Sequence, residues 1–119
     1  YDTDHNCHRD RDLYHETNEL QRNYTSIQTD VPTFFAHKDV HKQYDLIINP
    51  SCEHMADIKA VKGPMYALTS NNYKGIKGHI NTISKHEELA VKNGINNIAY
   101  EGSLKLTNYT RYCTIGSVK

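Results

Sequence analysis

Apolar residues near the start of the chain recur at helical spacing. Within residues 6–23, Cys7, Leu13, Tyr14 and Leu20 interrupt an otherwise polar segment that contains neither Gly nor Pro. Apolar residues that repeat about every three, four or seven positions lie on one face of a helix. The segment is therefore predicted to form an amphipathic helix.

Three short segments downstream have the patterns of β-strands. In residues 24–31, Tyr24, Ser26 and Gln28 alternate with Thr25, Ile27 and Thr29, and Pro32 follows the segment. This alternation predicts a short edge strand. Residues 33–43 then form a polar linker that contains two Phe and several His. Residues 44–48 and 65–70 are short, mostly apolar runs. Such runs are typical of strands that are buried on both faces, so we predict two buried strands here.

Helices are predicted between and after these strands. Residues 55–62 have room for one or two helical turns. Ser84 and Glu87 have the spacing of a capping box, which predicts a helix through about Lys92. Gly94 is the expected C-terminal stop of that helix, because glycine adopts the left-handed conformation at low cost.

The end of the chain has the pattern of a hairpin. Residues 95–105 and 109–118 alternate around Thr107 and Asn108, which predicts two antiparallel strands. Strands followed by helices and a terminal hairpin predict an α/β fold with a Rossmann-like, mostly parallel sheet and a C-terminal antiparallel hairpin. A chain of 119 residues has room for one core, so we expect a single domain over residues 1–119.

Composition narrows the class of protein. Fourteen basic and fourteen acidic residues cancel, and no basic cluster is long enough to neutralise a row of phosphates, so we expect no electrostatically driven nucleic-acid binding. Three widely spaced cysteines predict reduced thiols and a cytoplasmic protein, not a secreted disulfide framework. No stretch approaches the roughly 20 apolar residues of a membrane span.

Polar segments are predicted at the carboxyl ends of the strands, where open α/β sheets bind ligands. Asp2 fits an acceptor for ribose hydroxyls, since an ionised carboxylate binds them in a bidentate manner. Asp4 fits either that ligand role or the N-cap of the first helix. Two further polar segments lie at the ends of predicted strands. Asp30 and Val31 end the predicted edge strand, and residues 70–73 lie at the end of the second buried strand.

The segment after the first buried strand carries the most candidate chemistry. Pro50 stiffens the turn and leaves the Asn49 amide poised to orient a nucleophilic amine, although ordinary turn chemistry explains the same dipeptide. Cys52, Glu53 and His54 place a thiol, a carboxylate and an imidazole in one loop. Glu53 or His54 would serve as a general base, and Cys52 as a nucleophile if His54 lowered its pKa.

A metal site is the alternative use of these residues. Cys52 and His54 would bind an ion together with His5, Cys7 or His8. Zinc motifs normally pair their ligands at closer, regular spacings, and this chain matches none of them. We therefore assign no metal ligand from the sequence, and the metal site stays open as an alternative.

Glycines mark a mobile loop after the second buried strand. Gly75 and Gly78 lie in it, close to Tyr73 and His79. The two aromatic side chains either belong to a lid over a ligand or lie in a solvent-exposed loop without a function.

The string from Tyr44 to Met55, Tyr-Asp-Leu-Ile-Ile-Asn-Pro-Ser-Cys-Glu-His-Met, resembles the fourth-strand motif of class I S-adenosylmethionine-dependent methyltransferases. The resemblance is especially to small methyltransferase-like proteins of tailed phages. Residues 70–73, 79–81 and 100–112 resemble that group too, so the resemblance covers most of the chain.

The resemblance implies S-adenosylmethionine as the cofactor and a methyl transfer as the reaction. Asp2 would hold the ribose of the adenosyl group and Asp30 its adenine amine. Asn49 and Pro50 would form the edge nearest the methyl group.

Two departures from the family pattern change what is expected. Ser51 and Cys52 stand where amine methyltransferases have an aromatic residue soon after the Pro, which leaves the methyl acceptor open. The first strand and the glycine-rich loop of the family should precede Asp2, and the chain contains neither, so we expect a domain truncated at its N-terminus. Cofactor affinity should then be low unless a homo-oligomer supplies the missing side of the cofactor-binding site.

The alternative function is a non-catalytic metal-binding or protein-interaction module.

Overall fold

The computed structural model describes residues 27–29 and 31–119 of the chain. The chain divides into two compact units, Tyr1–Phe34 and Phe35–Lys119, and each is described by itself. Most of the first unit, including the predicted helix over residues 6–23, lies outside the described residues. The expectation of a single domain therefore stays a prediction.

A short helix, α2 (Val31–Phe34), belongs to the first unit. Most of the strand predicted over residues 24–31 lies outside the described residues, and Gln28 forms a single β-bridge. The predicted end of that strand is wrong, because Val31 already begins α2. Pro32 is tolerated in the first turn of a helix, since the first N–H groups of a helix have no intrahelical partner.

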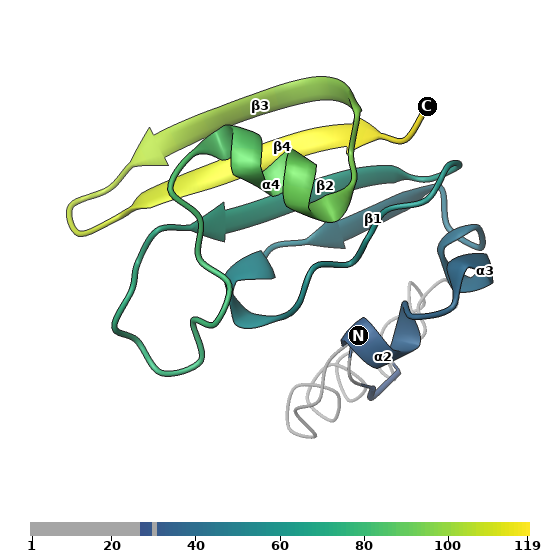
Figure 1. The fold of residues 1–119 in the computed structure, drawn as a ribbon, viewed down its shortest axis with the longest axis horizontal. Coiled ribbons are helices and arrows are strands. Elements are labelled where there is room, and N and C mark those ends of the chain that lie inside the picture. Colours follow the sequence, from purple (N-terminus) through teal and green to yellow (C-terminus); the bar gives the residue numbers. More distant parts are fainter. Residues whose placement is uncertain (1–26, 30) are drawn as a thin grey trace, which may run out of the picture. The chain divides into compact units, whose positions relative to one another are not determined.

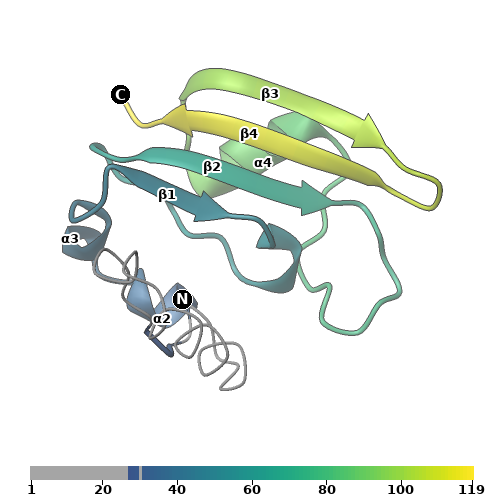
Figure 2. The ribbon, with the colours of Figure 1, turned by 180° about the vertical axis from the view of Figure 1, so that it is seen from behind.

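An open, four-stranded sheet forms the body of the second unit (Figures 1 and 2). The strands are β1 (Leu46–Asn49), β2 (Met65–Asn71), β3 (Asn97–Lys105) and β4 (Thr110–Ser117). They lie in the order β1–β2–β4–β3. The β1–β2 pair is parallel, whereas β4 is antiparallel to both of its neighbours.

The strand positions predicted from the sequence are confirmed for the second unit. The C-terminal hairpin is confirmed as well, and its turn is closed by a bond from the Leu106 N–H to the Tyr109 carbonyl at 2.8 Å. The fold is a mixed α/β sheet in which β1, β2 and β3 run in one direction and β4, which lies between β2 and β3, runs in the opposite direction; the Rossmann-like plan stays a prediction. The hairpin enters the sheet with β4 beside β2, and this adds two antiparallel pairings to one parallel pairing.

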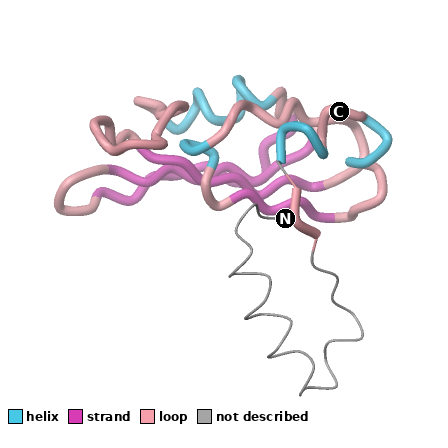
Figure 3. Tube along the Cα trace, turned by 90° about the horizontal axis from the view of Figure 1, so that it is seen from below, coloured by secondary structure: helices cyan, strands magenta, loops and turns pink. Residues whose placement is uncertain are grey.

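One face of the sheet carries the core. The helix α4 (His86–Asn93) packs against β2, β3 and β4. Figure 3 views the sheet along its edge and shows a layer of helices and loops on one side of the strands. Tyr66, Leu68 and Thr114 point to this side and are each 0% exposed, and α4 adds the buried Leu89 and Ala90. Each large apolar side chain buried here contributes on the order of 1.5–3 kcal/mol.

The opposite face is apolar and open in the described structure. Leu46 and Ile48 on β1 are 51% and 65% exposed. The register places Ile48, Ala67, Ile115 and Tyr100 in one row across this face. Within the second unit, the prediction that β1 is buried on both faces is therefore wrong. Successive side chains of a strand point to opposite faces, and the described elements of the second unit cover only one of them.

The segment after β1 does not contain the predicted helix over residues 55–62. A single turn of 3₁₀-helix, η2 (Cys52–His54), comes first, and residues 55–62 are irregular. Backbone N–H groups of this segment bond to the end of α4. The Ile58 N–H donates to the Asn93 side-chain oxygen at 3.0 Å, and the Ala60 N–H to the Asn93 carbonyl at 2.7 Å. These external partners replace the bonds of a local helix.

The predicted start of α4 is wrong and its predicted end is confirmed. The N-cap is Lys85, which makes no side-chain capping bond. The Ser84 N–H donates to the Glu88 carboxylate at 3.4 Å, so Ser84 and Glu87 do not form a capping box. Gly94 ends the helix in the left-handed conformation, with φ of 77°.

The linker predicted over residues 33–43 contains another short helix, α3 (Lys38–His41). Its last residue, His41, is 1% exposed. All helices in the described part of the chain are short, and none is long and apolar enough to cross a membrane.

Candidate functional site

The loop after β1 starts at the carboxyl edge of the parallel β1–β2 pair. Asn49 ends β1 and is 6% exposed. Its side-chain oxygen accepts a bond from the Ser51 N–H at 3.0 Å, and its side-chain nitrogen donates to the Met55 sulfur at 3.2 Å. The amide therefore shapes the turn. A ligand that used its N–H₂ group would replace only a bond to sulfur, which is a weak acceptor.

The carbonyl of Pro50 ties the loop to the sheet. It accepts a bond from the Thr69 hydroxyl on β2 at 2.8 Å and one from the Arg111 guanidinium on β4 at 3.3 Å. The direction in which the loop leaves β1 is thereby fixed by two neighbouring strands. The ring of Pro50 itself is exposed.

Cys52 points into the protein and is 4% exposed. Its thiol donates to the Asn49 carbonyl at 3.6 Å. Burial, followed by the negative charges of Glu53 and Asp57, raises the pKa of the Cys52 thiol to about 12. The thiolate is the nucleophile, so a thiol held protonated argues against the nucleophilic role that the sequence suggested for Cys52.

Glu53 also points inward and is 4% exposed. Asn71, the last residue of β2, donates its side-chain N–H to Glu53 Oε1 at 3.0 Å. The other oxygen, Oε2, is buried without a hydrogen-bond partner in the described part of the chain. A buried polar atom without a partner is unfavourable. Packing alone therefore does not explain why a carboxyl group occupies this position.

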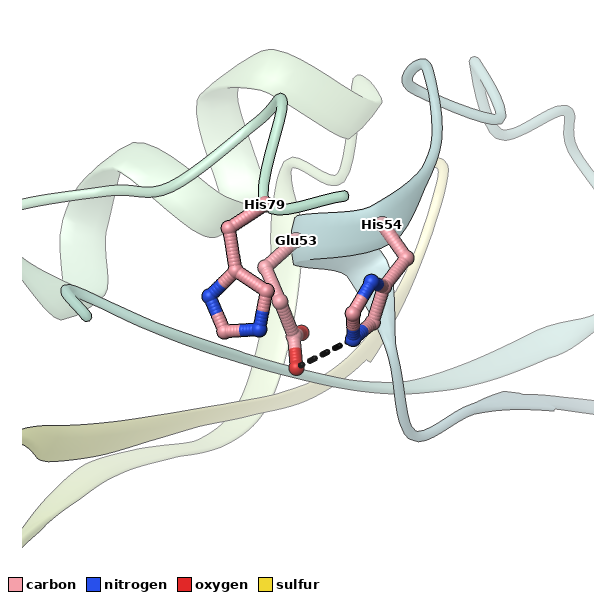
Figure 4. A group of neighbouring side chains, drawn as sticks. All are labelled: Glu53, His54 and His79. Atoms are coloured by element: carbon pink, nitrogen blue, oxygen red, sulfur yellow. Dashed lines mark ion pairs between the residues drawn. The ribbon is translucent and has the colours of Figure 1, made fainter. Parts of the chain in front are cut away.

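Two imidazoles face this carboxyl group (Figure 4). His54 Nε2 lies 3.8 Å from Glu53 Oε1, and the rings of His54 and His79 meet edge to face with centroids 4.5 Å apart. One ligand-type atom from each of the three side chains lies within 4.8 Å of the other two. His54 belongs to η2 and His79 to the loop after β2, so the two loops at the carboxyl edge of the parallel pair build one cluster.

The hydrogen bonds of the two imidazoles fix where their protons sit. His54 Nδ1 lies 3.1 Å from the Gly78 carbonyl oxygen, and His79 Nδ1 lies 2.7 Å from the Tyr73 carbonyl oxygen. A carbonyl only accepts, so both Nδ1 atoms donate. In the neutral imidazoles Nε2 is therefore unprotonated, and Figure 4 shows both Nε2 atoms on the side of Glu53.

A network around Asn81 holds the second loop against the first. The Asn81 N–H donates to the Glu53 carbonyl at 3.0 Å. The Asn81 side chain donates to the Met55 carbonyl and to the Asp57 carboxylate, both at 2.9 Å. Lys92 on α4 donates to the Asn81 side-chain oxygen. The geometry of the cluster is thus supported by residues that do not belong to it.

The sequence pointed to some of these residues and missed others. Glu53 and His54 were predicted as site residues, and both lie in the cluster. His79 was assigned to a lid or a solvent loop, and Asn71 received no role. A histidine next to glycine, in the loop after a second parallel strand, is the signal that could have placed His79 at this edge.

The other predicted ligand residues belong to the first unit or lie outside the described residues. Val31 begins α2, which belongs to the first unit. The remaining candidates lie outside the described residues, and their roles stay predictions. They are Asp2, Asp4 and Asp30 for the cofactor, and His5, Cys7 and His8 for a metal.

Comparison of the chain with protein-family models, with curated proteins and with solved structures finds no match. Strand order and local chemistry are therefore the basis for assigning a function. The cluster offers an unprotonated imidazole nitrogen that can accept a proton, and three donor atoms that can surround a cation.

Proposed function

We propose that this chain is a class I S-adenosylmethionine-dependent methyltransferase-like domain with a Rossmann-like sheet. The cofactor would bind at the carboxyl edge of β1 and β2. The observation that carries the proposal is the position of Asn49 and Pro50: Asn49 ends β1, which pairs in parallel with β2, and Pro50 directly follows it. Open α/β sheets bind their ligands outside the carboxyl ends of parallel strands.

The polar character of this edge supports a ligand there. Asn49, Ser70 and Asn71 end the two parallel strands, and they are 6%, 0% and 4% exposed. Polar side chains that served only to meet water at a sheet edge would be exposed. Asn71 donates to Glu53, and Ser70 Oγ is buried without a hydrogen-bond partner among the described residues, so these strand ends hold polar groups that packing alone does not require.

Methyl transfer mainly requires that donor and acceptor are held in line, with a base only when the acceptor must lose a proton. His54 is the better of the two candidate bases, because its side chain is 45% exposed and its Nε2 is unprotonated in the neutral ring. Glu53 is buried behind it and would position His54. Cys52 takes no part as a nucleophile, because its thiol stays protonated.

The cofactor contacts are proposed residue by residue. Asp2 and Asp4 would accept hydrogen bonds from the ribose hydroxyls. Asp30 and Val31 would contact the adenine, and Asn49 the edge nearest the methyl group. These assignments rest on the resemblance of residues 44–55 and 70–73 to the methyltransferase motifs.

Calorimetric titration of the full chain with S-adenosylmethionine tests the proposal. We expect saturable heat, and we expect Asp2→Ala to weaken binding at least tenfold, which corresponds to about 1.4 kcal/mol. Asp39→Ala is the matched control, because Asp39 is an exposed carboxylate on α3, away from the carboxyl edge. No heat at millimolar cofactor, or equal losses in the two variants, would contradict the proposal.

A further inference from the structure

The cluster of Glu53, His54 and His79 has a second feature that methyl transfer does not require. Three potential ligand atoms from two separate loops come within 4.8 Å of one another. Figure 4 shows the two imidazole rings and the carboxyl group pointing toward one another. Their positions are held by bonds from outside the cluster, including the bond from Asn71 to Glu53 at 3.0 Å.

The protonation pattern of the two histidines is that of metal ligands. In metal sites, an imidazole that binds through one ring nitrogen almost always donates its other N–H to a carbonyl or a carboxylate. His54 and His79 donate Nδ1–H to the carbonyl oxygens of Gly78 and Tyr73, at 3.1 and 2.7 Å. Both Nε2 lone pairs are therefore directed to the side where Glu53 lies.

The carboxyl group supplies an independent observation. Glu53 has a side chain that is 5% exposed, and its Oε2 atom is buried without a hydrogen-bond partner among the described residues. An ion pair between a protonated His54 and Glu53 would engage Oε1, at 3.8 Å, and would leave Oε2 unsatisfied. A cation between the three side chains would compensate the buried carboxylate.

Two imidazole nitrogens and one carboxylate oxygen define the class of ion. Calcium and magnesium prefer sites made of oxygen atoms, whereas imidazole suits zinc and its neighbours in the first transition row. A His₂Glu set with one open position is a common zinc arrangement. Bond lengths of about 2.0–2.2 Å place tetrahedral ligand atoms about 3.3 Å apart, so small side-chain rotations would close the cluster around the ion.

We propose that Glu53, His54 and His79 form a binding site for one divalent transition-metal ion of the zinc type. The two Nε2 atoms and the carboxylate are its protein ligands, and water occupies the fourth position. Asn71, Gly78 and Tyr73 orient the ligands. The site does not depend on the methyltransferase proposal, because it uses only the geometry of the second unit. While the ion is bound, His54 Nε2 is a ligand and does not act as a base.

Metal titration of the chelator-treated full chain tests the site. We expect zinc to bind with one-to-one stoichiometry by calorimetry and to raise the thermal midpoint, because it binds the folded chain preferentially. Cobalt should give the visible absorption bands of a tetrahedral site. His54→Ala and His79→Ala should each lower zinc affinity at least tenfold, and Glu53→Gln should do the same.

Two control variants distinguish this site from other residues of the chain that could bind zinc. His86 and Glu87 form a surface pair at 3.2 Å, so His86→Ala removes a comparable histidine elsewhere and should leave zinc binding unchanged. A variant with His5, Cys7 and His8 all replaced by Ala removes the alternative ligand set, and it should bind zinc like the parent chain. Far-UV circular dichroism checks folding, and the variants of the half-exposed histidines decide the result if Glu53→Gln does not fold.

Three results would overturn the proposal. The first is the absence of zinc binding at micromolar to millimolar metal. The second is unchanged affinity in both His54→Ala and His79→Ala. The third is loss of binding in the His5, Cys7 and His8 variant, which would place the ion in the first unit. A flat titration with S-adenosylmethionine would leave the metal site standing, so the two proposals fail separately.

Discussion

The Tyr66 hydroxyl lies 2.7 Å from His41 Nδ1, and this contact joins β2 to α3 inside the core. Both side chains are almost fully buried, at 0% and 1% exposure. His41 Nε2 donates to the Phe35 carbonyl at 2.9 Å, so Nδ1 of the neutral ring accepts the hydroxyl proton of Tyr66. The Tyr66 oxygen accepts in turn from the Val61 N–H at 3.0 Å. Every polar atom along this short chain of hydrogen bonds has a partner.

Tyr66→Phe should therefore lower the free energy of unfolding by about 1–3 kcal/mol, because it leaves His41 Nδ1 and the Val61 N–H buried without partners. Urea denaturation followed by circular dichroism measures the change. Tyr100→Phe is the matched control at a tyrosine that is 56% exposed, and it should change stability by less than about 0.5 kcal/mol. Similar losses in both variants would show that the buried network adds nothing.

The positions of the strands could be predicted from the sequence because they depend on local patterns. β2 is a short apolar run between glycine or proline and polar residues, and β3 and β4 alternate around a polar turn. The direction of pairing could not be predicted in the same way. It depends on which strand β4 lies beside, and residues far apart in the chain determine that neighbour.

Burial and the site were only partly predictable for a related reason. His41 stands in a segment that reads as a polar linker, and only its bonds to Tyr66 and Phe35 make its burial favourable. Glu53 and His54 are adjacent in the sequence, so their chemistry was visible. His79 joins them only because the loop after β2 folds back, held by the Asn81 network.

The alternating burial of β1 predicts opposite results for two adjacent isoleucines. Ile47 is 6% exposed on the covered face, and Ile48 is 65% exposed on the open face. Ile47→Ala should cost about 2–5 kcal/mol of unfolding free energy, and Ile48→Ala less than about 1 kcal/mol. Denaturant titration of both variants checks this. A large loss for Ile48→Ala would mean that another segment or a second molecule covers the open face in solution.

Cys52 predicts a loss of stability at alkaline pH. Its pKa rises from 9.0 in the unfolded chain to about 12 in the folded protein, mainly because the thiol is buried. The folded state therefore holds a proton that the unfolded state releases between these pH values. The resulting stabilisation is complete below about pH 9 and is lost as the pH rises toward 12, with a slope of up to about 1.4 kcal/mol per pH unit.

The measurement is urea denaturation between pH 8 and 11 in the presence of a chelator. Cys52→Ala should reduce the slope. Burial also raises the pKa of Tyr66 above its ordinary value of 10.0, so part of the slope should remain in that variant. A parent protein whose stability does not change over this range would contradict the burial of both groups.

Two glycines of the hairpin differ in what surrounds them, and this gives a matched pair of variants. A Cβ atom at Gly116 would lie 2.6 Å from the Asn97 carbonyl oxygen and 2.8 Å from the Ile95 side chain. The carbonyl belongs to the backbone of the neighbouring strand and cannot move without disturbing the β3–β4 register. A Cβ atom at Gly102 would lie 2.5 Å from the hydroxyl of Tyr100, the free end of an exposed and rotatable side chain.

Gly116→Ala should therefore destabilise the protein by about 1–3 kcal/mol, in the range of overpacked cores. Gly102→Ala should cost less than about 1 kcal/mol, because the ring of Tyr100 can swing away from the strand. Thermal and urea denaturation of the two variants, with the parent chain as reference, measure the difference. Equal stability of the two variants would show that β3 and β4 yield easily at Gly116, and that the close approach of the Asn97 carbonyl does not fix the hairpin.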